Sequence, residues 1–243
     1  AEKAAEDFPA DDPRLALTIS FLAVVEADRE RFDRAKQLHD AALVLIETAV
    51  AKENVDAQLI RLRNAEFMQA QNDAARAREK FEVVLELEKA KENPNPDFTA
   101  RSQWGLAKIS FADRDWRTAG RYGMFARQDL QRLYGRNSLE QAHTLPVLAE
   151  CAIRLDQFSY ARAWLNEMRA ISDTSPAISE TLELNRIEGL YMDQLNQFEA
   201  ANRVSARQRI GVMINKAAER FPTGRPFLLV REDLELLETN FKL

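Results

Sequence analysis

A small residue recurs along this chain at a nearly constant step, and this recurrence restricts the fold more than any other feature. Ala23 is followed at steps of 42 residues by Ala65, Ala107 and Ala149, and a last step of 40 residues reaches Gly189. A second series keeps the same register: Ala35, Ala77, Ala119, Ala161 and Ala201. Because two antiparallel helices approach closely only where the side chains at their crossing are small, the two series predict five tandem helical hairpins.

Two further series indicate how the hairpins stack. An aromatic residue recurs near the start of each expected second helix, except in the second unit, where Ala74 stands: Phe32, Trp116, Phe158 and Phe198. A third series decays toward the C-terminus: Ala42, Val84, Ala126, Met168 and Gln208. Each hairpin alone leaves an apolar face open, which the next hairpin covers. We therefore expect the aromatic residues to fill the gaps between successive hairpins.

The composition fits helices throughout, because glycine (7) and proline (8) are scarce among 243 residues and apolar residues make up 46%. The spacing of apolar residues predicts first helices over 13–29, 55–71, 97–113, 138–155 and 176–195, and second helices over 31–52, 73–92, 115–134, 157–172 and 198–220. Cap residues followed by proline mark two of the starts, at Asp12 and Ser175. Asn72, Asp156 and Asn196 are expected in tight turns, where a left-handed backbone is often needed.

Three segments depart from the regular hairpin. Residues 1–8 align with the tail of a second helix, and we expect either a short N-terminal cap or the remnant of a longer array. Apolar positions after the breaker at 221–226 predict a C-terminal capping helix over 227–241; docking of this helix on another subunit is the alternative. Pro146 falls inside the expected helix 138–155, which favours a kink or a later helix start over a notch for a ligand.

These features resemble the tetratricopeptide repeat (TPR), which has a small residue in its first helix and an Ala-x3-large pattern in its second. Ala77 and Phe81 are the clearest copy of that pattern. The common repeat has ~34 residues, and the longer step here is similar to the long-helix variant of kinesin light chains and many bacterial repeat proteins. The resemblance covers residues 12–221 and implies an all-α fold, a right-handed α-α superhelix of five hairpins plus the C-terminal helix. HEAT repeats share the period but lack the small-residue ladder, and they remain the alternative.

The repeat register also predicts the domain organisation. We expect one solenoid domain over 1–243, with repeats at 12–53, 54–95, 96–137, 138–175 and 176–221. The first four repeats keep the strict step, and the fifth is shorter.

Charge and cysteine content narrow the classes of partner. The net charge is −5, and arginines alternate with Glu and Asp along the expected helices, so we expect no nucleic-acid partner. No stretch approaches the ~20 apolar residues of a membrane-spanning helix, and we expect a soluble protein without membrane insertion. A single cysteine, Cys151, allows no internal disulfide, which suits the cytoplasm and permits the periplasm. The start AEKAAED indicates a processed or truncated N-terminus, so the compartment stays open.

Groups that could carry chemistry are few and far apart. His39 and His143 are the only histidines, and His143 lies eight residues before Cys151. That spacing is about 12 Å along a helix, too far for a thiol–imidazole pair. Cys151 belongs to an apolar series and is expected to be buried. Since no metal, phosphate-loop or dinucleotide motif is present, we expect no cofactor, no metal and no enzymatic activity.

The resemblance implies where a partner would bind. In tetratricopeptide arrays the first helices line the concave surface, at positions one residue after the ladder residue and three and six residues before it. Transferred to this sequence, these positions predict a binding face that includes Leu62, Glu66, Arg101, Trp104, Lys108, His143, Glu150 and Arg186. Two devices of family members are missing: a Lys/Asn clamp for a terminal carboxylate, and an Asn-Asn pair before the Leu-Ala of the first helix.

Two functions fit this sequence. The first is a scaffold that binds a peptide or helix of a partner protein in the concave groove, with Trp104 as an aromatic anchor and Arg101 and Lys108 pairing with acidic groups. The alternative is a structural protein that self-assembles end to end as a homo-oligomer, through the open first repeat and the C-terminal helix.

Overall fold

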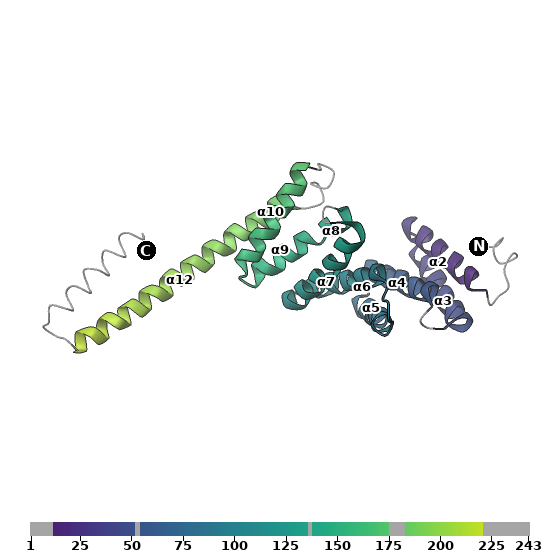
Figure 1. Cartoon of the computed structure of the whole chain (residues 1–243), viewed down its shortest axis with the longest axis horizontal. Coiled ribbons are helices and arrows are strands. Elements are labelled where there is room, and N and C mark those ends of the chain that lie inside the picture. Colours follow the sequence, from purple (N-terminus) through teal and green to yellow (C-terminus); the bar gives the residue numbers. More distant parts are fainter. Residues whose placement is uncertain (1–11, 52–53, 136–137, 175–182, 221–243) are drawn as a thin grey trace. The chain divides into compact units, whose positions relative to one another are not determined.

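The described part of the chain is built from α-helices. The computed structural model describes residues 12–51, 54–135, 138–174 and 183–220, and every regular element in these ranges is an α-helix (Figure 1). The chain divides into two compact units, Ala1–Ile187 and Glu188–Leu243. The helices expected over 1–8 and 227–241 lie outside the described residues.

Four helical hairpins make up the first unit. Their helices pair in chain order: α2 (Pro13–Asp28) with α3 (Phe32–Ala49), α4 (Val55–Ala70) with α5 (Ala74–Lys89), α6 (Pro96–Ala112) with α7 (Trp116–Tyr134), and α9 (Leu145–Arg154) with α10 (Phe158–Thr174). Asp12, Asn54 and Asn95 cap three of the first helices by accepting hydrogen bonds from backbone N–H groups of the first turn. The all-α repeat fold that the sequence predicted is thereby confirmed.

The small-residue ladder lies in the interior of these four hairpins. Both members of the ladder are fully buried in every hairpin, and so is the third series: Ala23, Ala35, Ala42, Ala65, Ala77, Val84, Ala107, Ala119, Ala126, Ala149, Ala161 and Met168. Protein interiors are packed as densely as organic crystals, so these positions have no space for larger side chains. The period of the ladder therefore reports the crossing points of the helices.

The aromatic residues at the starts of the second helices are not equivalent. Trp116 meets Phe111 of its own hairpin edge-on at 5.2 Å between ring centroids, and the guanidinium of Arg154 in the next hairpin lies 5.7 Å from its ring. Trp116 thus bridges two hairpins, as predicted. Phe32 is 44% exposed, so the prediction that it fills the gap between two hairpins is wrong.

The turn inside each hairpin repeats with the same geometry. Glu30, Asn72, Arg114 and Asp156, spaced 42 residues apart, all have a positive φ between 56° and 64°. The next residue in each case donates its backbone N–H to the carbonyl five residues earlier, at 2.8–2.9 Å. This pattern is a Schellman motif, which ends a helix with one left-handed residue. The expectation for Asn72 and Asp156 is confirmed.

Replacing Arg114 with glycine is expected to stabilise the fold by about 1 kcal/mol, because a left-handed backbone is costly for any residue with a Cβ. Arg114 is exposed and has φ 61°. Thermal denaturation followed by circular dichroism measures the effect. The matched control is Arg121→Gly in the middle of α7, where glycine should instead cost about 1 kcal/mol; equal effects at the two positions would contradict the role of the turn.

Pro146 marks a later helix start rather than a notch. The expected helix 138–155 consists of a short α8 (Leu139–Ala142), a turn at His143 and Thr144, and α9, in which Pro146 is the second residue. A proline in the first turn costs no helical hydrogen bond, since its N–H would have no partner there. The hydroxyl of Thr144 donates to the carbonyl of Gln141 at 2.7 Å and closes the turn.

The fifth unit is not a hairpin. A single helix, α12 (Leu184–Arg220), replaces the two helices expected over 176–195 and 198–220, and Asn196 lies within it (Figure 1). The turn predicted at Asn196 is therefore wrong. The stretch contains no proline and is rich in helix formers, so nothing in it interrupts a helix. Ala201, the last member of the second ladder series, is exposed, unlike its four counterparts.

Candidate binding face

Not all residues of the predicted binding face reach the surface. Leu62 in α4 is fully buried and belongs to a core cluster that also contains Phe98 and Leu106 of α6. Because α6 packs against this side of α4, the position three residues before Ala65 is covered. Leu62 therefore holds the second and third hairpins together, and its assignment to the binding face is wrong.

Glu66 and Arg101 bind each other across two hairpins. Arg101 in α6 donates from Nη2 and Nε to the two carboxylate oxygens of Glu66 in α4, at 2.7 and 3.0 Å. It also donates from Nη1 to Asp97 at 3.3 Å. Burial opposes the charge on Arg101, but the hydrogen bonds and charges of Glu66 and Asp97 outweigh it and raise the Arg101 pKa. The contacts within the chain thus already hold Arg101, which was expected to pair with an acidic group of a partner.

Glu150 forms a second ion pair of this kind, near the end of the first unit. Its carboxylate accepts from Arg186 Nη2 at 2.8 Å and from Arg154 Nη2 at 3.3 Å. Arg186 also donates to Glu183 at 2.8 Å. Only 7% of the Glu150 side chain is exposed, so this residue serves packing more than recognition, while Arg186 remains half-exposed.

Lys108 and His143 hold the positions that Glu66 and Arg101 hold one repeat earlier, 42 residues back. Both Lys108 and His143 are exposed. Lys108 forms no ion pair with any side chain of the described residues. Desolvation lowers the pKa of Lys108, and the charge of Glu66 only partly opposes this shift. The structure therefore leaves a cation without an internal partner at this point of the face.

Lys108 lines a surface cavity of about 380 Å³ between the second and third hairpins. Glu66 and Gln69 of α4 and Ala74 of α5 line the same cavity. Trp104, one helical turn before Lys108, is partly exposed on α6. An aromatic side chain and an unpaired cation one turn apart lie on the same face of a helix, which is an arrangement that can hold an acidic segment with an apolar neighbour.

Sequence reasoning missed which charges are neutralised within the chain. The signal was present, since Glu66 and Arg101 lie 35 residues apart and carry opposite charges, and Glu150 and Arg186 lie 36 apart. In both pairs, an acidic residue lies one position after a ladder residue, and an arginine lies 35 or 36 residues later. Lys108 also lies one position after a ladder residue, but no acidic residue lies 35 or 36 residues later.

Two residues suited to acid–base or nucleophilic chemistry, Cys151 and His39, are buried. Cys151 is 2% exposed, as expected from its register, and burial, with the nearby charges of Glu150 and Asp115, raises its pKa to about 12. A thiol in this state is not a nucleophile, because the thiolate is the reactive form. His39 is 1% exposed and lies against Phe67, at 4.9 Å between ring centroids.

The described residues contain neither a metal-ion cluster nor a membrane-spanning helix. Among them, no three His, Cys, Asp or Glu side chains are grouped so as to hold a metal ion. None of the described helices combines the length and the apolar character that crossing a membrane requires.

No protein-family model and no curated protein matches this sequence, whereas solved structures match its fold. Nearly identical TPR-like repeats of the kinesin light chain type from Podosopora anserina superpose with a TM-score of 0.61 at 17% identity, over 81% of this chain and 98% of that one. RapI in its apo form superposes with a TM-score of 0.62 at 17% identity, over 90% and 79%. YrrB, a TPR protein with an unusual peptide-binding site, does so with 0.52 at 16% identity, over 95% and 97%. At these identities the likeness establishes a TPR-like all-α repeat fold.

Proposed function

We propose that this chain is a protein-interaction scaffold, and that it binds an acidic peptide segment or helix of a partner on the surface around Trp104 and Lys108. The observation that carries the proposal is the unpaired charge of Lys108. The arginines of the predicted face, Arg101 and Arg186, already bind carboxylates within the chain. Lys108 has no such partner among the described residues. An acidic group of a binding partner would therefore gain the most binding free energy at Lys108.

The surroundings of Lys108 support recognition of a peptide rather than of a lone anion. Trp104 offers an aromatic surface one turn away, and aromatic side chains are among the residues that dominate binding energy at interfaces. The ion pair between Glu66 and Arg101 fixes α4 against α6 and so holds the cavity in shape without the partner. Such preorganisation reduces the entropic cost of binding.

Two further observations favour a scaffold over an enzyme. The thiol of Cys151 is buried and held in its neutral form. The imidazole of His39 is buried against an aromatic ring and lies on a different hairpin from Cys151. The similarity to YrrB, itself a peptide-binding TPR protein, supports a peptide as the class of ligand.

Peptides that are selected from a random displayed library for binding to the wild-type chain are expected to contain acidic residues next to apolar residues. Their affinity, measured by fluorescence polarisation, should fall at least about 30-fold in the double variant Trp104→Ala, Lys108→Glu, which is the effect of losing about 2 kcal/mol at an interface hot spot. The reason is that the variant removes the aromatic surface and places a like charge opposite the acidic group.

The matched control is the double variant Phe125→Ala, Lys89→Glu, which makes the same change of charge and also removes an aromatic ring. Phe125 and Lys89 are exposed residues of the second helices α7 and α5, and their replacement should leave the affinity unchanged. Selected peptides that bind both double variants equally well, or that show no preference for acidic residues, would contradict the proposal. Sedimentation of the same samples tests the alternative, self-assembly, which predicts oligomers in the absence of any peptide.

A further inference from the structure

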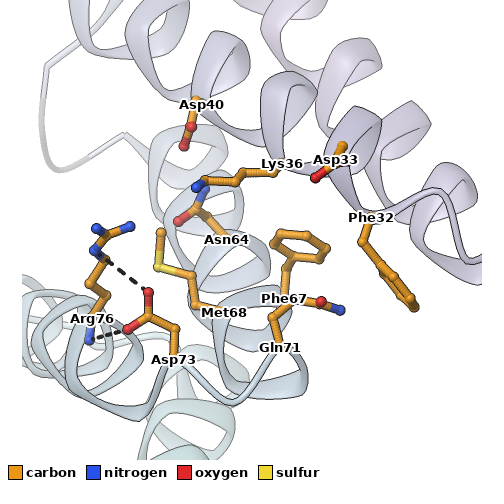
Figure 2. A pocket seen from close by; sticks show the side chains of 10 residues that line it. All are labelled: Phe32, Asp33, Lys36, Asp40, Asn64, Phe67, Met68, Gln71, Asp73 and Arg76. Atoms are coloured by element: carbon orange, nitrogen blue, oxygen red, sulfur yellow. Dashed lines mark hydrogen bonds and ion pairs between the residues drawn. The ribbon is translucent and has the colours of Figure 1, made fainter.

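A second hollow lies between the first two hairpins, away from Lys108. Figure 2 shows this pocket, which has a volume of about 240 Å³. Its lining comes from α3, α4, α5 and the residues next to them: Phe32, Asp33, Lys36, Asp40, Asn64, Phe67, Met68, Gln71, Asp73 and Arg76. Sites for small molecules usually measure about 300–1,000 Å³, so this volume suits one side chain of a partner rather than a whole cofactor.

Asn64 is the unusual residue of this pocket. The equivalent positions in the next two repeats are Leu106 and Leu148, both fully buried. Asn64 is fully buried as well, and neither its amide nitrogen nor its amide oxygen has a hydrogen-bond partner among the described residues. A buried polar group without a partner destabilises a fold, and leucine would fit the repeat better. The pocket places this amide next to a hollow that a ligand could fill.

The charges around Asn64 favour a cation. Asp33 and Asp40 lie on α3 on either side of Lys36, and no ion pair joins Lys36 to any described side chain. Asp73 and Arg76 of α5 are 3.5 Å apart and neutralise each other. Figure 2 shows the Asn64 amide between the α3 residues Lys36 and Asp40 and the α5 pair. The two free carboxylates outweigh the single lysine, so the pocket carries a net negative charge.

Aromatic side chains form the remaining wall. Phe32 is 44% exposed, although its counterpart Trp116 is packed between two hairpins, and Phe67 lies beside it in the pocket (Figure 2). Guanidinium groups stack on aromatic faces and bind carboxylates through two parallel hydrogen bonds. Arg63 shows this stacking elsewhere in the chain, with its guanidinium carbon 3.8 Å from the centroid of the Phe21 ring.

We propose that this pocket binds an arginine side chain of a peptide or protein partner. The guanidinium stacks on Phe67, donates to Asp40, and gives the carbonyl oxygen of Asn64 the hydrogen bond that it lacks. Asp33, about 10 Å from Asp40 along α3, adds negative charge, and Phe32 closes the apolar side of the pocket. Lys36, whose ammonium shares this region in the free chain, swings outward to make room. The site is independent of the surface around Lys108, since it selects the opposite charge and uses other residues.

The test titrates the full chain with an acetylated alanine-based peptide that contains one arginine, and with the same peptide containing citrulline, which has nearly the same shape without the charge. Nuclear magnetic resonance of nitrogen-labelled protein follows the binding. We expect at least tenfold tighter binding of the arginine peptide, with the largest shifts at the Asn64 side-chain amide and at Phe32 and Phe67. Equal binding of the two peptides, or shifts confined to other surfaces, would overturn the proposal.

Three variants separate recognition from structure. Asn64→Leu should raise the melting temperature, as the leucines at equivalent positions imply, and yet weaken arginine binding several-fold. Lys36→Met should strengthen it, because the competing ammonium is gone. The control Glu79→Gln changes an exposed carboxylate of α5 outside the pocket and should have no effect. Unchanged binding in Asn64→Leu would overturn the role of the amide. Arginine binding should persist in the Trp104→Ala, Lys108→Glu variant. Failure of acidic-peptide binding near Lys108 is therefore distinguishable from failure of arginine binding near Asn64.

Discussion

Replacing Gly105 with alanine is expected to lower the free energy of unfolding by about 1–3 kcal/mol, although alanine is ordinarily the better helix former. A Cβ at this position would lie 2.3 Å from Cζ and 2.4 Å from Cε2 of the Phe81 ring. Phe81 is fully buried in α5, so its ring cannot move aside without displacing the core between the second and third hairpins. Urea denaturation followed by far-ultraviolet circular dichroism measures the loss.

A double-mutant cycle tests whether the close approach of Gly105 and Phe81 is the cause. Phe81→Ala alone should cost about 3–5 kcal/mol by leaving a cavity. The double variant should cost less than the sum by about 1 kcal/mol or more, because the new methyl group occupies part of that cavity. Gly120→Ala is the control: its Cβ would lie 3.6 Å from that of Cys151, an ordinary contact. If Gly105→Ala were as well tolerated as Gly120→Ala, the helices α5 and α6 would not be in this close contact.

The helices of the first four hairpins could be predicted from the sequence because the ladder reports a local physical requirement. A crossing point needs a small side chain whatever the rest of the chain does, so Ala65 and Ala107 mark their helices independently of each other. The fifth unit shows the limit of this reasoning. Gly189 and Ala201 continue the series in the sequence, but Ala201 is exposed, and a small residue alone does not make a crossing.

The turns were predictable only in part, for a different reason. Asn72 and Asp156 are residue types that tolerate a left-handed backbone, whereas Glu30 and Arg114 adopt it at a cost. Tertiary packing of the hairpins imposes the conformation on them. The repeat register would have located these two turns, since Glu30 and Arg114 each lie 42 residues from Asn72.

The candidate site was predicted least well, because neighbouring hairpins decide which residues remain available. Leu62 was placed on the face by its register, but Phe98 and Leu106 of the following hairpin belong to the core cluster that buries it. Arg101 was predicted to meet a partner, but Glu66 of the preceding hairpin binds it. The repeat register predicts the direction in which a side chain points from its own helix. The residues that fill the space in front of that side chain belong to another helix, and the register does not predict them.

Acidification from pH 6.5 to about 4 is expected to weaken the fold through His39, by up to about 3 kcal/mol. Burial lowers the pKa of His39 from 6.5 to about 4; the charge of Asp40 opposes this shift and that of Arg63 adds to it. Between these two pH values the unfolded chain binds a proton that the folded chain does not bind. The contribution of His39 to stability is therefore complete above pH 6.5, falls as the pH is lowered, and changes no further below about pH 4, where the folded state is protonated too.

Urea denaturation at a series of pH values checks this expectation. His39→Leu should flatten the loss of stability between pH 6.5 and 4, the window set by the two pKa values of His39. Carboxylates titrate in the same range, but they do so in the variant as well, so the difference between the two curves isolates His39. His143→Gln is the control, because His143 is exposed and its replacement should leave the curve unchanged. A wild-type curve that matches that of His39→Leu would mean that the imidazole takes up its proton in the folded chain, and that the first two hairpins open enough to admit water next to Phe67.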